Sequence, residues 1–124
     1  MDFARYYTRT FEIPPGVRAA PLGVVVVAPP WNFPYAIPAS GVLAPLMAGN
    51  AVILKPAPET TLTAWHLAQQ LWRAGVPREV LQFFPCPDGD VGKSLISIDR
   101  KTSRYLSLGF VPHDLFVQNK RHGF

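Results

Sequence analysis

Residues 22–28 read Leu-Gly-Val-Val-Val-Val-Ala, an apolar run that sharply limits what this chain can fold into. A strand with one face in water alternates apolar and polar side chains. This run is apolar throughout, as strands are in a parallel sheet that is covered on both faces. Two more largely apolar runs follow at residues 51–55 and 80–84. The sequence therefore predicts parallel strands at these three places.

Segments with helical spacing follow these runs. Residues 35–50 have apolar residues at helical intervals, although Pro45 is expected to interrupt or kink a helix there. Residues 62–74 form a clearer amphipathic segment, which Thr60 or Thr61 can cap. A short helix is expected after the third run. This alternation, with short links, predicts right-handed βαβ crossovers and an α/β fold: a Rossmann-like parallel sheet with helices on both faces.

Ligands of such sheets bind beyond the carboxyl ends of the strands. The first run is followed there by Pro-Pro-Trp-Asn-Phe-Pro, residues 29–34, a stiff apolar turn around one amide, Asn32. The second run ends in Lys55, the only charged residue between Arg18 and Glu59. On the residues alone, a turn-capping role for Asn32 and a solvated strand end for Lys55 are the favoured interpretations.

Composition and charge argue against two other classes of protein. The chain has 124 residues, 48% hydrophobic and 16% charged, which suits one globular domain. Its net charge of +4 is uneven, because residues 1–98 carry seven Lys/Arg against six Asp/Glu and residues 99–124 carry five against two. Without a basic stripe outside the tail, we expect no nucleic-acid partner. Prolines divide the uncharged stretch 19–54 into pieces too short to cross a membrane, so no membrane span is expected.

The cellular compartment is suggested by cysteine usage. The single cysteine, Cys86, excludes an internal disulfide and fits a reducing compartment. The first residues are charged and aromatic and lack the apolar centre of a signal peptide. The expected location is the cytoplasm.

Several motifs, in order and at matching spacing, resemble the dinucleotide-binding domain of the aldehyde dehydrogenase superfamily. They are Pro-Trp-Asn-Phe-Pro at 30–34, Ala-Gly-Asn-x-Val-x-x-Lys-Pro at 48–56 and Ala-Gly-Val-Pro at 74–77. Within the superfamily the chain is most similar to glutamate-γ-semialdehyde (pyrroline-5-carboxylate) dehydrogenases and the matching domain of proline-utilisation proteins. Since the resemblance covers residues 2 to about 98, residues 1–98 are predicted to be an incomplete NAD(P)-binding domain and 99–124 a divergent basic tail.

The resemblance implies NAD-dependent oxidation of an aldehyde to a carboxylic acid, with NADP as an alternative cofactor and no metal. It makes Asn32 a catalytic residue whose amide donates to the substrate oxyanion, and it reverses the preference for a capping role. It implies that Lys55 hydrogen-bonds the adenine ribose. The cofactor-binding positions that it implies are Ala28, Pro30, Trp31, Lys55, Ala57 and Pro58. Full-length relatives are expected to be homo-oligomers, and the substrate that the resemblance implies is glutamate γ-semialdehyde.

Other positions depart from the family's pattern. The family's nucleophilic cysteine lies in a motif downstream of where this sequence stops, so Cys86 is interpreted as a structural thiol. Only Gly109 matches the family's pyrophosphate-binding turn. Many relatives place a glutamate three residues after the lysine, where this chain has Pro58 and then Glu59, so weak discrimination between NAD and NADP is expected. The alternative function is a non-catalytic nucleotide-binding or assembly remnant of the same fold.

Overall fold

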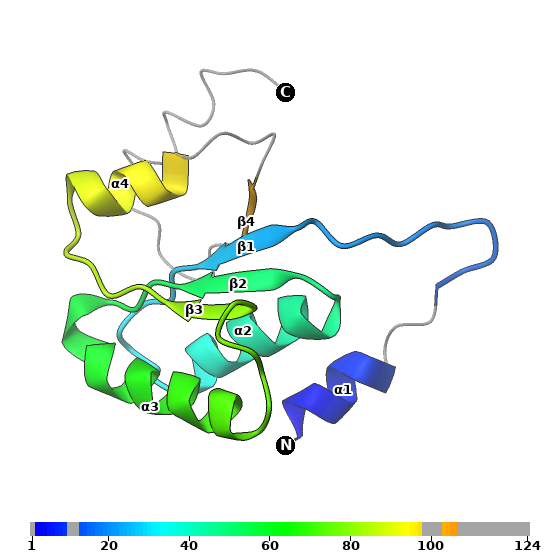
Figure 1. The fold of residues 1–124 in the computed structure, drawn as a ribbon, viewed down its shortest axis with the longest axis horizontal. Coiled ribbons are helices and arrows are strands. Elements are labelled where there is room, and N and C mark those ends of the chain that lie inside the picture. Colours follow the sequence, from blue (N-terminus) through cyan, green and yellow to red (C-terminus); the bar gives the residue numbers. More distant parts are fainter. Residues whose placement is uncertain (1, 10–12, 98–102, 107–124) are drawn as a thin grey trace.

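A computed structural model describes residues 2–9, 13–97 and 103–106 of the chain (Figure 1). The element order alternates strands and helices after a short first helix. The elements are α1 (Phe3–Arg9), β1 (Val24–Val27), α2 (Ala36–Met47), β2 (Ala51–Leu54), the 3-10 turn η1 (Pro58–Thr60), α3 (Thr61–Arg73), β3 (Leu81–Phe83), α4 (Asp90–Ser97) and β4 (Ser103–Leu106). The three predicted strands are confirmed, each slightly shorter than the apolar run that predicted it.

The strands form one parallel sheet in the order β3-β2-β1-β4. Val27 at the end of β1 is in register with Leu54 of β2, and Leu54 is in register with Phe83 of β3. All three strands therefore end at the same edge of the sheet. β4 pairs with the other side of β1.

Helices cover both sides of the sheet, as the sequence predicts. Figure 1 shows α2 and α3 on one side of the strands and α4 on the other. The core between the sheet and the α2/α3 side consists of Val25, Val27, Val42, Val52, Leu54, Ala64 and Leu81. Small and branched residues at these positions allow the helices to approach the strands closely.

Local details differ from the sequence-based expectations at two places. α2 continues through Pro45 without interruption and ends two residues later, at Met47. Thr60 occupies the N-cap position of α3, but its side chain makes no capping hydrogen bond. Its hydroxyl instead donates to the carbonyl of Ala57, 3.3 Å away, because the preceding 3-10 turn brings that oxygen within reach.

A buried asparagine joins β1 to the end of α2. Asn50 is 5% exposed. Its Oδ1 accepts from the amides of Leu22 and Gly23 at 2.5 and 3.1 Å, and its Nδ2 donates to the Pro45 carbonyl at 3.1 Å. Because every one of these groups would otherwise lose a partner, Asn50 is structural rather than part of a ligand site. This side chain sets where β1 begins relative to α2.

Candidate functional site

The sheet order places a topological switch point at the end of β1. The chain proceeds from β1 to β2 and β3 on one side, whereas β4 lies on the other side of β1. In open parallel sheets the loops that diverge at such a point leave a crevice in which ligands bind. The turn at residues 28–35 leaves the sheet there, and the loop that begins at Lys55 leaves from the next strand. The structure thus brings both sequence-predicted segments to one edge.

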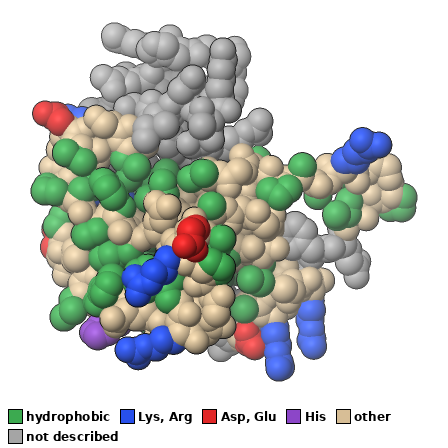
Figure 2. Space-filling view, in the orientation of Figure 1, with side chains coloured by type: hydrophobic (Ala, Val, Ile, Leu, Met, Phe, Trp, Pro, Cys, Tyr) green, Lys and Arg blue, Asp and Glu red, His purple; other side chains and the backbone are tan. Residues whose placement is uncertain are grey.

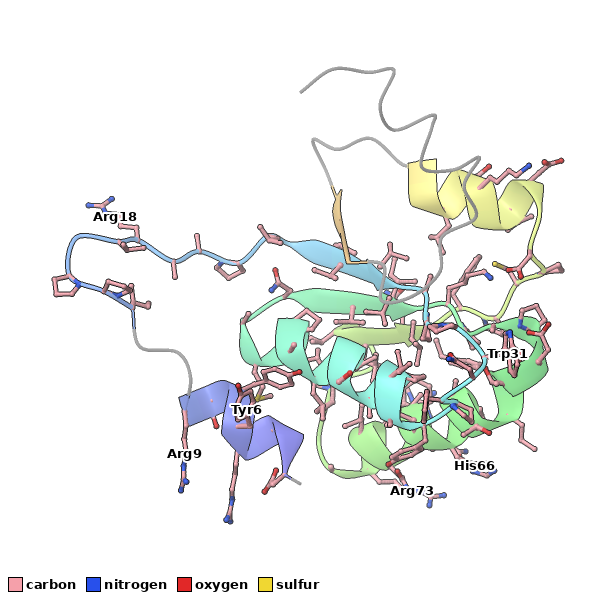
Figure 3. All side chains as sticks on the ribbon, turned by 180° about the vertical axis from the view of Figure 1, so that it is seen from behind. Tyr6, Arg9, Arg18, Trp31, His66 and Arg73 are labelled. Atoms are coloured by element: carbon pink, nitrogen blue, oxygen red, sulfur yellow. The ribbon has the colours of Figure 1, made fainter. Side chains whose placement is uncertain are left out.

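The proline turn presents its central amide to solvent. Pro29 is buried, Ala28 and Pro30 are half-buried, and Trp31, Asn32 and Phe33 are exposed. Trp31 lies in the loop that leaves the end of β1 (Figure 3). Within the residues that the structure describes, the Asn32 side chain makes no hydrogen bond to the backbone, so it does not cap the turn there. Its NH₂ group is therefore free to donate to a ligand.

The end of this turn is anchored to two helices. The Phe33 carbonyl accepts from the amide of Ile37 at 3.4 Å, and the Tyr35 carbonyl accepts from Ala39 at 2.9 Å, which begins α2. The Tyr35 hydroxyl lies 2.6 Å from Oε1 of Gln70 on α3, to which it donates. The turn is thus held rigidly at its exit, which suits a side chain that must point in one direction.

Lys55 is buried, so its interpretation as a solvated strand end is wrong. Lys55 is only 6% exposed. Its backbone amide donates to the Val27 carbonyl at 2.9 Å, directly after the last residue pair of β1 and β2. Its Nζ donates to Oδ1 of Asp88 in an ion pair. Burial of an ammonium is costly unless it is paired, and Asp88 supplies that pairing. An ammonium has three N–H donors, so the ion pair leaves capacity for a further acceptor.

Asp88 is the site residue that sequence reasoning missed. It lies in the β3–α4 loop, thirty-three residues from Lys55, and its side chain is 72% exposed. The loop leaves the sheet directly beside β2, since the Phe84 amide donates to the Leu54 carbonyl at 2.9 Å. The only available signal was a carboxylate shortly after the third strand, at the same edge as Lys55. The spacing of residues along the sequence does not reveal which strand lies next to β2 in the sheet.

α4 passes close to the Lys55 side chain at Gly92. A Cβ at this position would lie 3.4 Å from the Pro87 carbonyl oxygen and 3.5 Å from Cε of Lys55. Gly92 is buried. α4 and the loop before it therefore pack directly over the Lys55 side chain and enclose it.

The other predicted site positions are distributed between the two loops. Ala57 is half-buried, and Pro58 and Glu59 are exposed at the start of η1. Cys86 is half-buried in the β3–α4 loop, nearer in sequence to Asp88 than to the proline turn. His66 is exposed on α3 (Figure 3). Gly109 lies outside the described residues.

The described segments contain neither a metal site nor a membrane-spanning helix. Among the residues of known placement, no three His, Cys, Asp or Glu side chains come together in a way that would hold a metal ion. None of the helices described is both long enough and apolar enough to cross a bilayer. Figure 2 shows the basic side chains scattered over one face, and hydrophobic ones gathered toward the side where the strands end.

Comparisons with known proteins agree with this geometry. The sequence profile of the aldehyde dehydrogenase family matches residues 8–106. The 1-pyrroline-5-carboxylate dehydrogenase of Staphylococcus epidermidis is 38% identical over 120 residues, covering 86% of this chain and 23% of the relative. The enzyme of the same name from a Geobacillus species is 39% identical, with the same coverage.

Solved structures of aldehyde dehydrogenases also superpose on this chain. A variant of Thermus thermophilus 1-pyrroline-5-carboxylate dehydrogenase superposes with a TM-score of 0.67 at 30% identity, covering 79% of this chain and 21% of that one. An NAD-dependent benzaldehyde dehydrogenase from Corynebacterium glutamicum superposes with a TM-score of 0.59 at 35% identity, covering 62% of this chain and 17% of that one. The chain spans about a quarter or less of the length of these proteins.

Proposed function

The chain belongs to the aldehyde dehydrogenase family, and from that premise we propose that it forms the cofactor-facing part of an enzyme that oxidises an aldehyde to a carboxylic acid. One observation supports this most: the buried Lys55 and the exposed Asn32 lie on neighbouring loops at the switch point of a parallel sheet. This is the place where such sheets bind dinucleotides. The proposed cofactor is NAD, with NADP as the alternative.

The residues present fit a dinucleotide. Lys55 has an ammonium with unused donor capacity at the edge of the sheet, and we assign it to the hydroxyls of the adenine ribose. Trp31 and Pro30 offer an apolar surface for the nicotinamide side, and Ala28, Ala57 and Pro58 line the two loops without charge. The cofactor, when bound, accepts a hydride from the substrate. The chain's own contribution is to bind it and to hold its two ends apart.

Asn32 is the residue that we assign to catalysis. As an aldehyde carbon is attacked, negative charge develops on its oxygen, and a donor that is already oriented stabilises that charge without reorganisation. The prolines on both sides of Asn32 and the anchored start of α2 provide such orientation. The substrate that we propose is glutamate γ-semialdehyde, oxidised to glutamate in proline catabolism. This choice of substrate is supported by the name that the similar bacterial dehydrogenases share, 1-pyrroline-5-carboxylate dehydrogenase.

The cellular setting follows from the same family assignment. We propose a cytoplasmic enzyme whose full-length form is a homo-oligomer and whose partner is a small aldehyde rather than nucleic acid. A reducing compartment is consistent with the single, unpaired Cys86.

The cofactor assignment is tested by titrating NAD⁺ into the 124-residue chain and following its amide NMR signals. Lys55→Met should weaken the affinity at least tenfold, because a hydrogen bond to a charged group contributes about 1.5–3 kcal/mol. The matched control is Lys93→Met, which removes an exposed lysine of α4. Equal affinities for the Lys55 variant and the parent chain would contradict a role of this lysine in cofactor binding.

A further inference from the structure

The carboxylate of Asp88 lies against the lysine that we assign to the adenine ribose. The pair is asymmetric, because the Lys55 side chain is 7% exposed and the Asp88 side chain is 72% exposed. If the ion pair served only to neutralise the buried Lys55 ammonium, the Asp88 carboxylate would not need to be exposed to solvent. Here the acid is exposed to solvent beside the ammonium, so a ligand that binds Lys55 comes close to the carboxylate.

The position of Asp88 is determined by the backbone around it. β3 ends in register with β2, and the Phe84 amide donates to the Leu54 carbonyl at 2.9 Å, so the loop begins beside Lys55. On its far side, α4 begins with the Lys93 amide donating to the Gly89 carbonyl at 2.8 Å. Asp88 therefore belongs to a short connection that is held at both ends.

We propose that Asp88 determines cofactor selectivity and favours NAD over NADP. This inference rests on the proposed function, in which Lys55 binds the adenine ribose. A carboxylate beside that ribose accepts a hydrogen bond from a 2′-hydroxyl, which NAD has. In NADP the same position carries a 2′-phosphate with about −1.5 to −2 charges, which the carboxylate repels.

Asp88 acts on selectivity through Lys55 as well. A 2′-phosphate would be attracted to the ammonium, but the ammonium is already paired with Asp88. The phosphate must therefore compete with an existing ion pair, whereas a hydroxyl can use the donors that the pair leaves free. The sequence predicts weak discrimination between NAD and NADP because Pro58 stands where many relatives have a glutamate. The structure provides a carboxylate from a different loop.

The test uses two ligands that differ only in the group in question: 5′-AMP and adenosine 2′,5′-bisphosphate. Both are titrated into the 124-residue chain, and the dissociation constants are measured by NMR at low ionic strength. The parent chain should bind 5′-AMP more tightly. Asp88→Asn should shift the ratio of the two affinities toward the bisphosphate at least tenfold, which corresponds to about 1.4 kcal/mol. The shift should shrink in high salt, since exposed charges are screened.

Two control variants test whether the effect of Asp88→Asn comes from the loss of the carboxylate charge at this position. Asp88→Glu keeps the carboxylate and should keep the parent preference, whereas Asp90→Asn removes an exposed acid two residues away and should leave the ratio unchanged. An Asp88→Asn variant with the parent ratio, in a chain that still binds 5′-AMP, would overturn this inference alone. A parent chain that binds neither nucleotide would overturn the proposed cofactor role and this inference with it.

Discussion

At the scale of single residues, two asparagines with the same chemistry have opposite surroundings. Asn50 is buried, and both ends of its amide are bonded to backbone groups. Asn32 is exposed in a turn stiffened by prolines, and its amide makes no bond in the described part of the chain. A satisfied amide holds a fold together, and a free, oriented one is available to a ligand. The difference between them is set by position in the fold, not by residue type.

Replacement of Asn32 by alanine should therefore affect turnover rather than cofactor binding. In a full-length aldehyde dehydrogenase that carries residues 20–98 of this chain, Asn32→Ala should lower kcat by about 10²–10³, the usual cost of one oxyanion donor. The KM for NAD⁺ should change little. His66→Ala is the control, because it removes an exposed side chain of α3 and leaves the turn and its anchoring bonds in place. A kcat within twofold of the parent would show that Asn32 is not the donor.

At the scale of elements, an aromatic side chain of α3 ties that helix to the edge strand β3. Nε1 of Trp72 donates to the buried Leu81 carbonyl at 2.9 Å, and the Arg78 guanidinium lies 4.2 Å from the centre of the Trp72 ring. The Trp65 ring packs edge-on against Trp72 and also meets Phe83 of β3. α3 is thus fastened by an oriented bond as well as by apolar packing.

Trp72→Phe removes this bond and keeps most of the aromatic surface. The Leu81 carbonyl then loses its partner, so the free energy of unfolding should fall by about 1–2 kcal/mol. Urea denaturation followed by circular dichroism measures the change. Trp31→Phe is the matched control: Trp31 is 65% exposed, and its replacement should stay within about 0.5 kcal/mol of the parent. Equal losses for both variants would contradict the role given to the hydrogen bond.

These elements also show what the sequence can and cannot predict. The apolar runs and helical spacing predict the strands, their parallel pairing and the helices, because those features depend on local periodicity and burial. Asp88 is different: its pairing with Lys55 depends on β3 lying next to β2 and on the path of the loop between β3 and α4. Pro45 likewise remains within α2 because tertiary packing overrides a local preference. The extent of the domain, residues 1–98, stays a prediction, although the family profile extends to residue 106 and β4 joins the sheet.

At the scale of the whole molecule, apolar side chains are exposed where the strands end. Trp31, Phe33 and Tyr35 are 65%, 59% and 46% exposed, and they follow one another along a single turn. The relatives that the chain matches are about four times as long or more. Apolar surface concentrated next to a ligand site is typical of a surface that another part of a protein covers. The candidate site is thus bordered by exposed apolar side chains.

We expect the 124-residue chain, assayed alone, not to oxidise aldehydes. A nucleophile must lie about 3–3.5 Å from the carbonyl carbon whose oxygen accepts from Asn32. The only thiol, Cys86, follows β3, whereas Asn32 follows β1 with β2 between them, so their loops begin about 10 Å apart. Cys86 also lies in the loop that carries Asp88, at the ribose end of the proposed site. Purified chain mixed with NAD⁺ and glutamate γ-semialdehyde should produce no NADH absorbance above a blank, while NMR titration of the same sample still reports NAD⁺ binding. Turnover that disappears in a Cys86→Ser variant would refute both the expected inactivity and the distance inferred between this thiol and Asn32.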